Sequence, residues 1–230
     1  DRVADPRWGG WNDAGGGGHF SARLTVALVA AGVVAKKMLP AEVHFRTRLT
    51  EIGGCTDPER FDEVLADAAA AHDSVGGIVE CCAEEVPACL GEPFFDSAES
   101  LIAHLLFAIP AVKGVEFGSG FAAARHRGSE NNDPILDAEG HTATNHDGGI
   151  NGGITNGNPL VVRAALKPTP SIARPQMTYN RATGRVEMLE IRGRHDVCVA
   201  LRGAVVVEAA VAIALADLHA GRPASTRTAR

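Results

Sequence analysis

Residues 43–50, VHFRTRLT, decide the fold class, because their alternation predicts a strand with one buried face. Two sets of side chains alternate there: Val43, Phe45, Thr47 and Leu49 against His44, Arg46, Arg48 and Thr50. Asp57 and Pro58 then stand where an N-cap and a first helical residue are expected. Apolar residues recur after them at helical spacing: Phe61, Val64, Leu65 and Ala68. A strand, a turn and an amphipathic helix therefore follow one another.

Outward from this stretch, strands and helices continue to both ends of the chain. Ser21 is a predicted N-cap for a helix over 22–39 that closes on Lys36 and Lys37. Asp96 and Glu99 predict a capping box for the helix that carries Leu101, Leu105 and Leu106. The remaining predictions are strands within 73–86, 111–121, 159–167 and 186–193, a final helix over 208–220, and a long mobile loop over 125–149.

This mixture of helices with hairpin-like strands favours an α/β sandwich of mostly antiparallel sheets with helices. Residues 1–220 are expected to form one domain, and residues 221–230 a disordered tail.

Composition limits the class of partner. The chain of 230 residues is 45% hydrophobic and has a net charge of -6, which gives no general attraction to nucleic acid or to anionic lipid. No apolar run approaches the ~20 residues of a membrane span, and no signal peptide is evident, so a cytoplasmic location is expected. The cysteines are Cys55, Cys81, Cys82, Cys89 and Cys198. Their odd number and the lack of a CxxC spacing predict reduced thiols and no metal site.

Glycine is abundant, with 26 residues, and it is concentrated near segments that could meet a ligand. These segments are GGGGHFSAR (15–23), GGINGGITNG (148–157), KPTPS (167–171) and GRHDVC (193–198). A glycine run before a helix can hold an anion, but it can equally be a plain turn. Likewise, His19 could bond only the backbone, Lys167 could be an ordinary solvated lysine, and Asp196 could pair with Arg194 or Arg202.

The motifs GGGGHFSARLT, DSVGG, GEPFFDS, PAVKGVEFG, GGINGGITNG, KPTPSI and RHDVCV occur in this order. With them the chain resembles the carboxyl-terminal two thirds of chorismate synthase, over about residues 2–220. The resemblance implies a lyase of the shikimate pathway of aromatic amino acid biosynthesis, which eliminates phosphate from 5-enolpyruvylshikimate 3-phosphate to give chorismate. It further implies a cytoplasmic, homotetrameric flavoprotein that needs reduced FMN. NADPH is the expected reductant, although the source of flavin reduction stays open.

The resemblance also implies roles for individual residues. Flavin contacts are expected at His19, Phe20, Ser21, Pro110, Ala111, Gly152, Lys167, Pro168, Thr169, Pro170, Ser171 and Arg194. Arg23 is the matching candidate for a substrate anion. Asp196 matches an aspartate that acts in removal of the ring proton.

In the family, two catalytic histidines and an arginine-rich motif precede the position of Asp1. The resemblance thus leaves an alternative open, a non-catalytic or incomplete flavin-binding relative.

Overall fold

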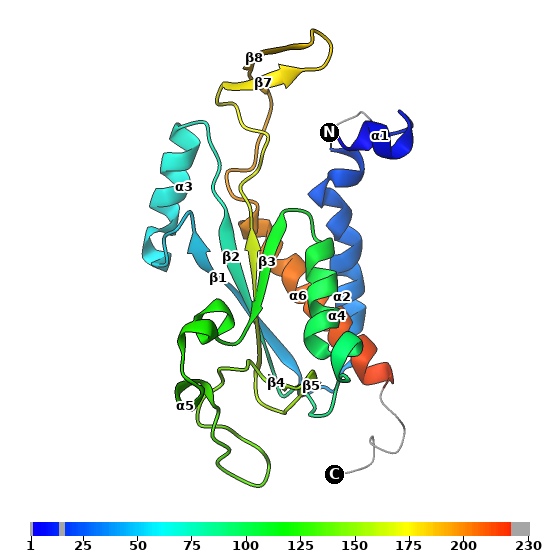
Figure 1. Ribbon diagram of the computed structural model, residues 1–230, viewed down its shortest axis with the longest axis vertical. Coiled ribbons are helices and arrows are strands. Elements are labelled where there is room, and N and C mark those ends of the chain that lie inside the picture. Colours follow the sequence, from blue (N-terminus) through cyan, green and yellow to red (C-terminus); the bar gives the residue numbers. More distant parts are fainter. Residues whose placement is uncertain (1, 14–16, 222–230) are drawn as a thin grey trace.

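The computed structural model describes residues 2–13 and 17–221, and its centre is a four-stranded sheet (Figure 1). The strand order is β1 (His44–Ile52), β2 (Gly77–Glu84), β6 (Leu160–Leu166) and β3 (Val112–Phe117), and each neighbouring pair is antiparallel. Two further antiparallel pairs are β4 (Ile150–Asn151) with β5 (Ile154–Thr155), and β7 (Gln176–Asn180) with β8 (Arg185–Leu189). The predicted mixture of helices and antiparallel strands is confirmed.

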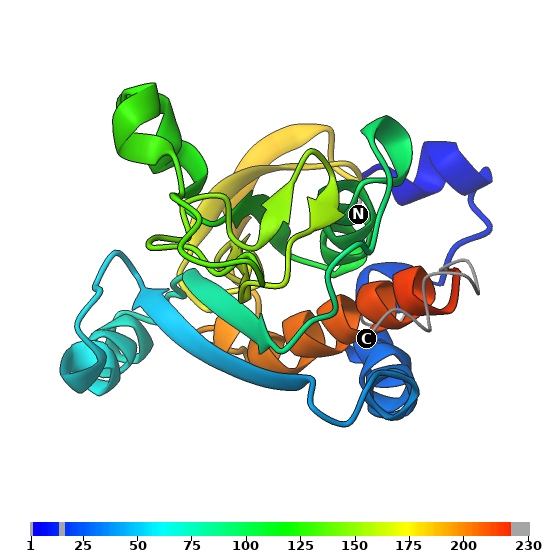
Figure 2. The same ribbon diagram turned by 90° about the horizontal axis from the view of Figure 1, so that it is seen from below.

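Helices cover one face of this sheet (Figures 1 and 2). The α-helices are α1 (Ala4–Trp8), α2 (Val26–Met38), α3 (Phe61–Ala70), α4 (Ala98–Ala108), α5 (Gly128–Asn131) and α6 (Ala200–Gly221). Short 3-10 helices span Gly18–Phe20, Ala22–Thr25, Pro58–Arg60, Phe94–Asp96 and Gly120–Arg125. Helix α6 packs against β1 and β2 and is itself packed by α2 and α4. Among the described residues, no helix is long and apolar enough to cross a membrane.

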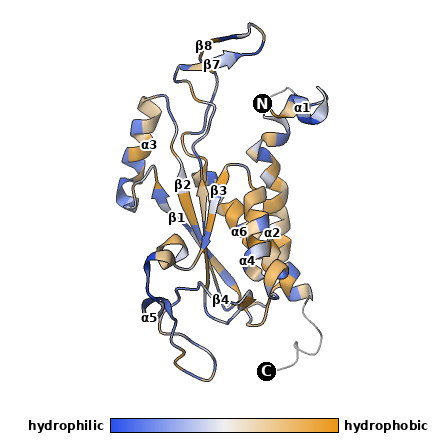
Figure 3. Ribbon diagram, in the orientation of Figure 1, coloured by the Kyte–Doolittle hydropathy of each residue, from blue (hydrophilic) through white to orange (hydrophobic). Residues whose placement is uncertain are grey.

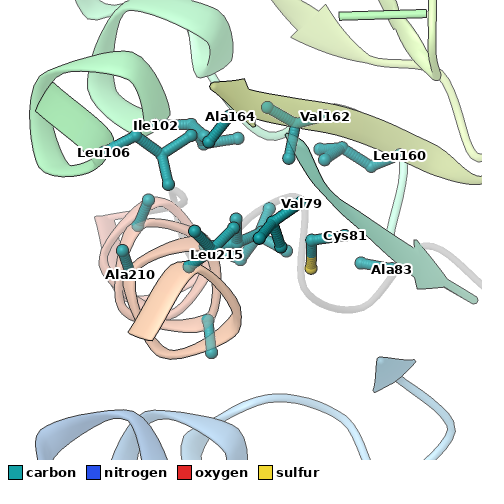
Figure 4. Close-up of a cluster of buried hydrophobic side chains, with 14 of the residues drawn as sticks. Val79, Cys81, Ala83, Ile102, Leu106, Leu160, Val162, Ala164, Ala210 and Leu215 are labelled. Carbon is teal, nitrogen blue, oxygen red and sulfur yellow. The ribbon is translucent and has the colours of Figure 1, made fainter. Parts of the chain in front are cut away.

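Alternation along the central strands builds the core (Figure 4). One face of β2 and β6 points at α4 and α6 and is fully buried: Val79, Cys81, Ala83, Leu160, Val162 and Ala164. Ile102 and Leu106 of α4 and Leu215 of α6 meet this face and are also fully buried. Cys82, one residue along from Cys81, is only half-buried, because successive strand residues face opposite sides.

The outer face of α2 is apolar but exposed. Gly32 and Ala35 are buried toward α6, whereas Val26, Val33, Val34 and Met38 are 72%, 53%, 59% and 55% exposed. In Figure 3 most of the ribbon of α2 has the colours of hydrophobic residues. The described residues therefore pack against only one side of this helix.

Several local predictions need correction. Ser97, not Asp96, caps α4: its hydroxyl accepts a hydrogen bond from Ser100 N at 3.0 Å. Asp96 lies inside the 3-10 turn Phe94–Asp96, so the first extended residue before the helix is Ser97. Helix α6 begins at Ala200 and not at 208, and the sequence did not predict α1 or β7. Of the tail predicted over 221–230, Gly221 is instead the last residue of α6, and residues 222–230 lie outside the described residues.

Candidate functional site

Three of the singled-out segments meet at one edge of the sheet, the upper edge in Figure 1. Here β6 ends and β2 and β3 begin, as their antiparallel pairing requires. Lys167 N, directly after β6, donates a hydrogen bond to Ala111 O at 2.9 Å. Residues 110–111 and 167–171 therefore lie side by side.

Residues 73–76, directly before β2, connect this pair to the third segment. Ser74 Oγ donates to Thr169 O at 2.7 Å, and Val75 N donates to Val197 O at 2.8 Å. We call residues 73–76, 110–111, 167–171 and 194–198 together the upper edge. The structure thus brings Pro110, Ala111, Lys167 through Ser171, Arg194 and Asp196 to one end of the sheet.

The upper edge has groups that suit an anionic, partly apolar ligand. The hydroxyl oxygen of Thr169 is buried and has no hydrogen-bond partner among the described residues. Lys167 and Arg194 are exposed at the same edge. Ala111 has a φ of 78°, a left-handed conformation that is rare outside glycine and is typical of functional sites when it occurs.

Asp196 pairs with Arg202, one of the two partners that the sequence left open. The carboxylate oxygens lie 3.2 Å from Nη2 and 3.3 Å from Nη1 of Arg202, so the contact is two-pronged. The Asp196 side chain is 39% exposed and that of Arg202 is 66% exposed. Arg202 therefore orients the carboxylate and leaves it accessible to a ligand.

His19, Phe20, Ser21 and Arg23 lie at the amino-terminal end of α2. The Ser21 hydroxyl accepts from Arg23 N at 3.2 Å and caps the 3-10 turn that runs into α2, as predicted. The rings of His19 and Phe20 lie 5.5 and 5.8 Å from the ring of Trp8. These contacts stay within the first 23 residues and do not include the upper edge. Gly15 and Gly16 lie outside the described residues.

Gly152 lies at the opposite end of the fold. It forms the turn between β4 and β5, and the next residue, Gly153, accepts a hydrogen bond from Ala98 N at 2.8 Å. Ala98 begins α4, whereas Pro110 follows its end. The helix of 11 residues separates them by about 16 Å. Among the predicted flavin contacts, Gly152 is therefore the one at the end of the fold opposite to the upper edge.

Sequence analysis missed the role of Asp133 in the loop over 125–149. Its carboxylate accepts from Thr144 Oγ1 at 2.6 Å, His146 N at 2.8 Å and Asp147 N at 3.0 Å. Burial raises the pKa of this carboxyl group, but the hydrogen bonds from Asp147, Thr144 and His146 outweigh burial and leave the pKa below its usual range. In the sequence, the Asp-Pro pair at 133–134 within a polar stretch is the feature that could have indicated this role of Asp133.

Asp133 also reaches the β4–β5 turn through a chain of side chains. Asn151 Nδ2 donates to Asp147 Oδ2 at 2.6 Å, and Asn156 Nδ2 donates to Asn151 Oδ1 at 2.6 Å. These residues line a surface cavity of about 720 Å³ beside the turn. No group of three metal-ligating side chains occurs among residues 2–13 and 17–221.

Comparison with known proteins gives one family. The family model for chorismate synthase matches residues 1–219. The chorismate synthase of Chitinophaga pinensis is 59% identical over 217 residues, which cover 94% of this chain and 64% of that relative. The chorismate synthase of Korarchaeum cryptofilum is 46% identical over 244 residues and is covered to 68%. The chain thus spans about two thirds of the length of these relatives.

The fold agrees with this result. A crystal structure of chorismate synthase superposes with a TM-score of 0.69 at 29% identity, over 86% of this chain and 63% of that one. The similarity to this crystal structure shows that the chain shares the family's arrangement of sheet and helices as well as its sequence. The chain belongs to the chorismate synthase family.

Proposed function

We propose that the protein with this chain is a chorismate synthase, a lyase that removes phosphate and a ring proton from 5-enolpyruvylshikimate 3-phosphate to give chorismate. The observation that carries the proposal is the upper edge, where hydrogen bonds hold residues 110–111, 167–171 and 194–198 around one end of the sheet. These are segments for which the sequence predicted flavin and catalytic contacts. The alternative of a non-catalytic relative has no comparable support, because the relatives in the comparison are chorismate synthases.

The residues at the upper edge fit a flavin mononucleotide. The buried Thr169 hydroxyl has no hydrogen-bond partner in the described part of the chain, and it can donate to a ligand oxygen. The Lys167 ammonium and the Arg194 guanidinium can hold a phosphate by charge-assisted hydrogen bonds. Pro110, Ala111, Pro168, Pro170 and Ser171 would line the same site, and His19, Phe20 and Ser21 would close it from α2. Reduced FMN, when bound, supplies an electron-rich ring beside the substrate with no net change of oxidation state.

Asp196 is the residue that would handle the proton. Its carboxylate is accessible, and Arg202 fixes its orientation through two contacts from one guanidinium group. A carboxylate placed in this way can steer the removal of a proton from a bound substrate. Arg23, exposed at the start of α2, would meet a carboxylate or phosphate of the substrate.

Four further points concern the whole protein. Residues 1–220 form one domain, the enzyme is a cytoplasmic homotetramer, and NADPH is the reductant that supplies the reduced flavin. The 5-enolpyruvylshikimate 3-phosphate of the shikimate pathway is the small-molecule substrate.

A flavin titration tests the proposal. Lys167→Ala should weaken FMN binding by about tenfold or more, because one charge-assisted bond to the phosphate is lost. Lys37→Ala is the matched control, since Lys37 is exposed in the last turn of α2, far from the upper edge. Binding is measured from the quenching of FMN fluorescence. If Lys167→Ala and Lys37→Ala bind FMN equally well, the upper edge does not hold the cofactor.

A further inference from the structure

The proposed flavin site has two parts that lie on different elements. One part is the upper edge, and the other is His19, Phe20 and Ser21 before α2. The contacts described above for these three residues do not reach the upper edge. Residues on two elements hold one ligand tightly only when their separation is fixed to within about 0.5 Å. Tight binding therefore requires a connection between the two parts.

Helix α1 is joined to the part before α2. The ring of Trp8, the last residue of α1, lies 5.5 Å from the ring of His19 and 5.8 Å from the ring of Phe20, measured between ring centroids. These separations are in the range that aromatic pairs favour. A shift of α1 would therefore move the predicted flavin contacts His19 and Phe20.

The β7–β8 hairpin is joined to the upper edge. In the chain it stands between residues 167–171 and 194–198, and in Figure 1 it extends beyond this edge. Arg174, which precedes β7, donates from its backbone N to His72 O at 3.1 Å, and its Nη1 lies 3.1 Å from Asp73 Oδ2. Since Asp73 belongs to the upper edge, the base of the hairpin is fixed there.

The tip of the hairpin meets α1. Arg181 lies in the turn between β7 and β8, and its Nη2 is 2.5 Å from Oδ2 of Asp5 in α1. A surface cavity of about 560 Å³ lies beside this ion pair and is lined by Arg2, Asp5, Pro6, Gly9 and Arg181. In the described part of the chain, the ion pair rather than close packing therefore joins the hairpin to α1.

Burial does not fix the position of the hairpin. Apart from Asn180 and Glu187, every residue of β7 and β8 is exposed. A two-stranded hairpin by itself is at best marginally stable in water. At the base, Gly193 has a φ of 142°, and a Cβ atom built there would have its nearest neighbour 4.0 Å away, so the chain can turn at this point. The position of the hairpin therefore depends on the ion pairs at its base and at its tip.

We propose that the β7–β8 hairpin is a positioning element that connects the two parts of the flavin site through the ion pair of Arg181 with Asp5. This inference rests on the proposed function, since the two parts form one site only if flavin binds there. Arg181 holds α1 through Asp5, and α1 holds His19 and Phe20 through Trp8. Arg181 and Asp5 are positioning residues, because they act on the ligand through other residues.

Reversing the charge of either partner tests this connection. Arg181→Glu and Asp5→Arg should each weaken FMN binding about threefold to fivefold, which is the range that a partly exposed ion pair supports. The double variant Asp5→Arg/Arg181→Glu restores opposite charges and should recover most of the affinity. Arg185→Glu is the matched control, because it makes the same change of charge on the hairpin, but Arg185 lies in β8 and not in the turn that meets α1. Binding is measured from the quenching of FMN fluorescence.

Asp5→Arg distinguishes the connection from a general attraction between charges. An added positive charge near the FMN phosphate would strengthen binding if attraction alone mattered, whereas loss of the ion pair should weaken binding. The affinities of the unaltered protein and of both single variants should converge at about 1 M salt, where the screening length is about 3 Å. The thermal midpoint should stay the same in all variants, because the side chains of Arg181 and Asp5 are 58% and 45% exposed.

Hydrogen exchange gives a measurement that needs no FMN. The backbone amides of Phe20 and Ser21 donate to Gly17 O and Gly18 O at 2.9 and 3.2 Å. Both amides should exchange faster in Arg181→Glu than in the unaltered protein, although residue 181 is far from them along the chain. Exchange in Arg185→Glu should equal that in the unaltered protein.

The outcomes separate the inference from the proposed function. If the unaltered protein binds FMN but Arg181→Glu binds it equally well, or leaves the exchange of Phe20 and Ser21 unchanged, the inference is overturned. It is also overturned if Asp5→Arg binds FMN more tightly, or if the double variant binds as weakly as the single variants. If the unaltered protein binds no FMN, the proposed function fails and the inference fails with it.

Discussion

A Cβ atom built on Gly32 in α2 would lie 2.5 Å from Cβ and 2.7 Å from Cα of Ala209 in α6. The two helices therefore touch backbone to backbone at this crossing, and only glycine fits on the α2 side. The contact is long-range and sets the position of α2 on the core. With α2 it also sets the position of Ser21 and Arg23, which precede the helix.

Gly32→Ala should lower the free energy of unfolding by about 1–3 kcal/mol, because α2 has to move away from α6. Alanine has the better helix propensity by about 1 kcal/mol, so the loss would be due to packing alone. Gly203→Ala is the control: a Cβ atom there lies 2.6 Å from Leu166 Cδ2, the end of a side chain that can turn. Urea denaturation of both variants measures the difference. If Gly32→Ala were as stable as the unaltered protein, α2 could move away from α6 without lowering the free energy of unfolding, and the close contact would not require glycine.

Asp196→Asn should lower turnover by on the order of a hundredfold, since the amide keeps the shape of the side chain but cannot hold the proton. Stability should change by less than about 1 kcal/mol, because the pair with Arg202 is largely exposed. Turnover is measured with chemically reduced flavin, and the thermal midpoint is measured in parallel. A purely structural role for Asp196 predicts normal turnover in the folded fraction, and that result would remove Asp196 from the mechanism.

Asp133→Asn should destabilise the loop over 125–149 by about 1–2 kcal/mol, because an amide group faces the N–H donors of His146 and Asp147. Faster hydrogen exchange of these two amides would report the change. Asp137→Asn is the control in the same loop, since the Asp137 side chain is 39% exposed. Similar exchange rates in Asp133→Asn and Asp137→Asn would contradict the conclusion that the Asp133 carboxylate stabilises this loop.

The same carboxylate predicts a pH dependence. The pKa of Asp133 is lowered in the folded protein, so its contribution to stability is present above the unfolded pKa of about 4 and is lost as the pH falls through the folded value. The loop should keep its protection from exchange between pH 7 and about 4 and lose it below. Asp133→Asn should abolish this step, and a step of the same size in the variant would assign the transition to another group.

Arg163→Met should destabilise the protein by about 1–3 kcal/mol at neutral pH. Arg163 lies on the sheet face away from the helices, between Glu116 at 3.0 Å and Glu80 at 3.5 Å, and it donates to Gly118 O at 2.7 Å. Its removal leaves two carboxylates without their shared cation. Arg48→Met is the control, since Arg48 also bonds Glu80 but is 74% exposed. Chemical denaturation should give Arg163→Met a clearly lower free energy of unfolding than Arg48→Met. The reverse order would contradict the role of Arg163 as the cation that Glu80 and Glu116 share.

Short-range patterns in the sequence predicted most of the fold. The alternation over 43–50 became β1, and the caps at Ser21 and Asp57 formed as expected, with Asp57 accepting from Glu59 N at 3.1 Å. The failure at Asp96 has a local cause too, because a 3-10 turn moved the helix start to Ser97. Strand β7 and the first turns of α6 were missed, since neither has a clean apolar period.

By itself the sequence determined the family, the strand and helix types and the residues that carry polar chemistry, because these depend on neighbours within a few positions along the chain. The tertiary structure decided which of those residues meet. It paired Asp196 with Arg202, joined residues 110–111 to 167–171 and placed Gly152 at the far end of β6. Such contacts depend on how a sheet and a helix layer pack together. Spacing along one chain does not specify that packing.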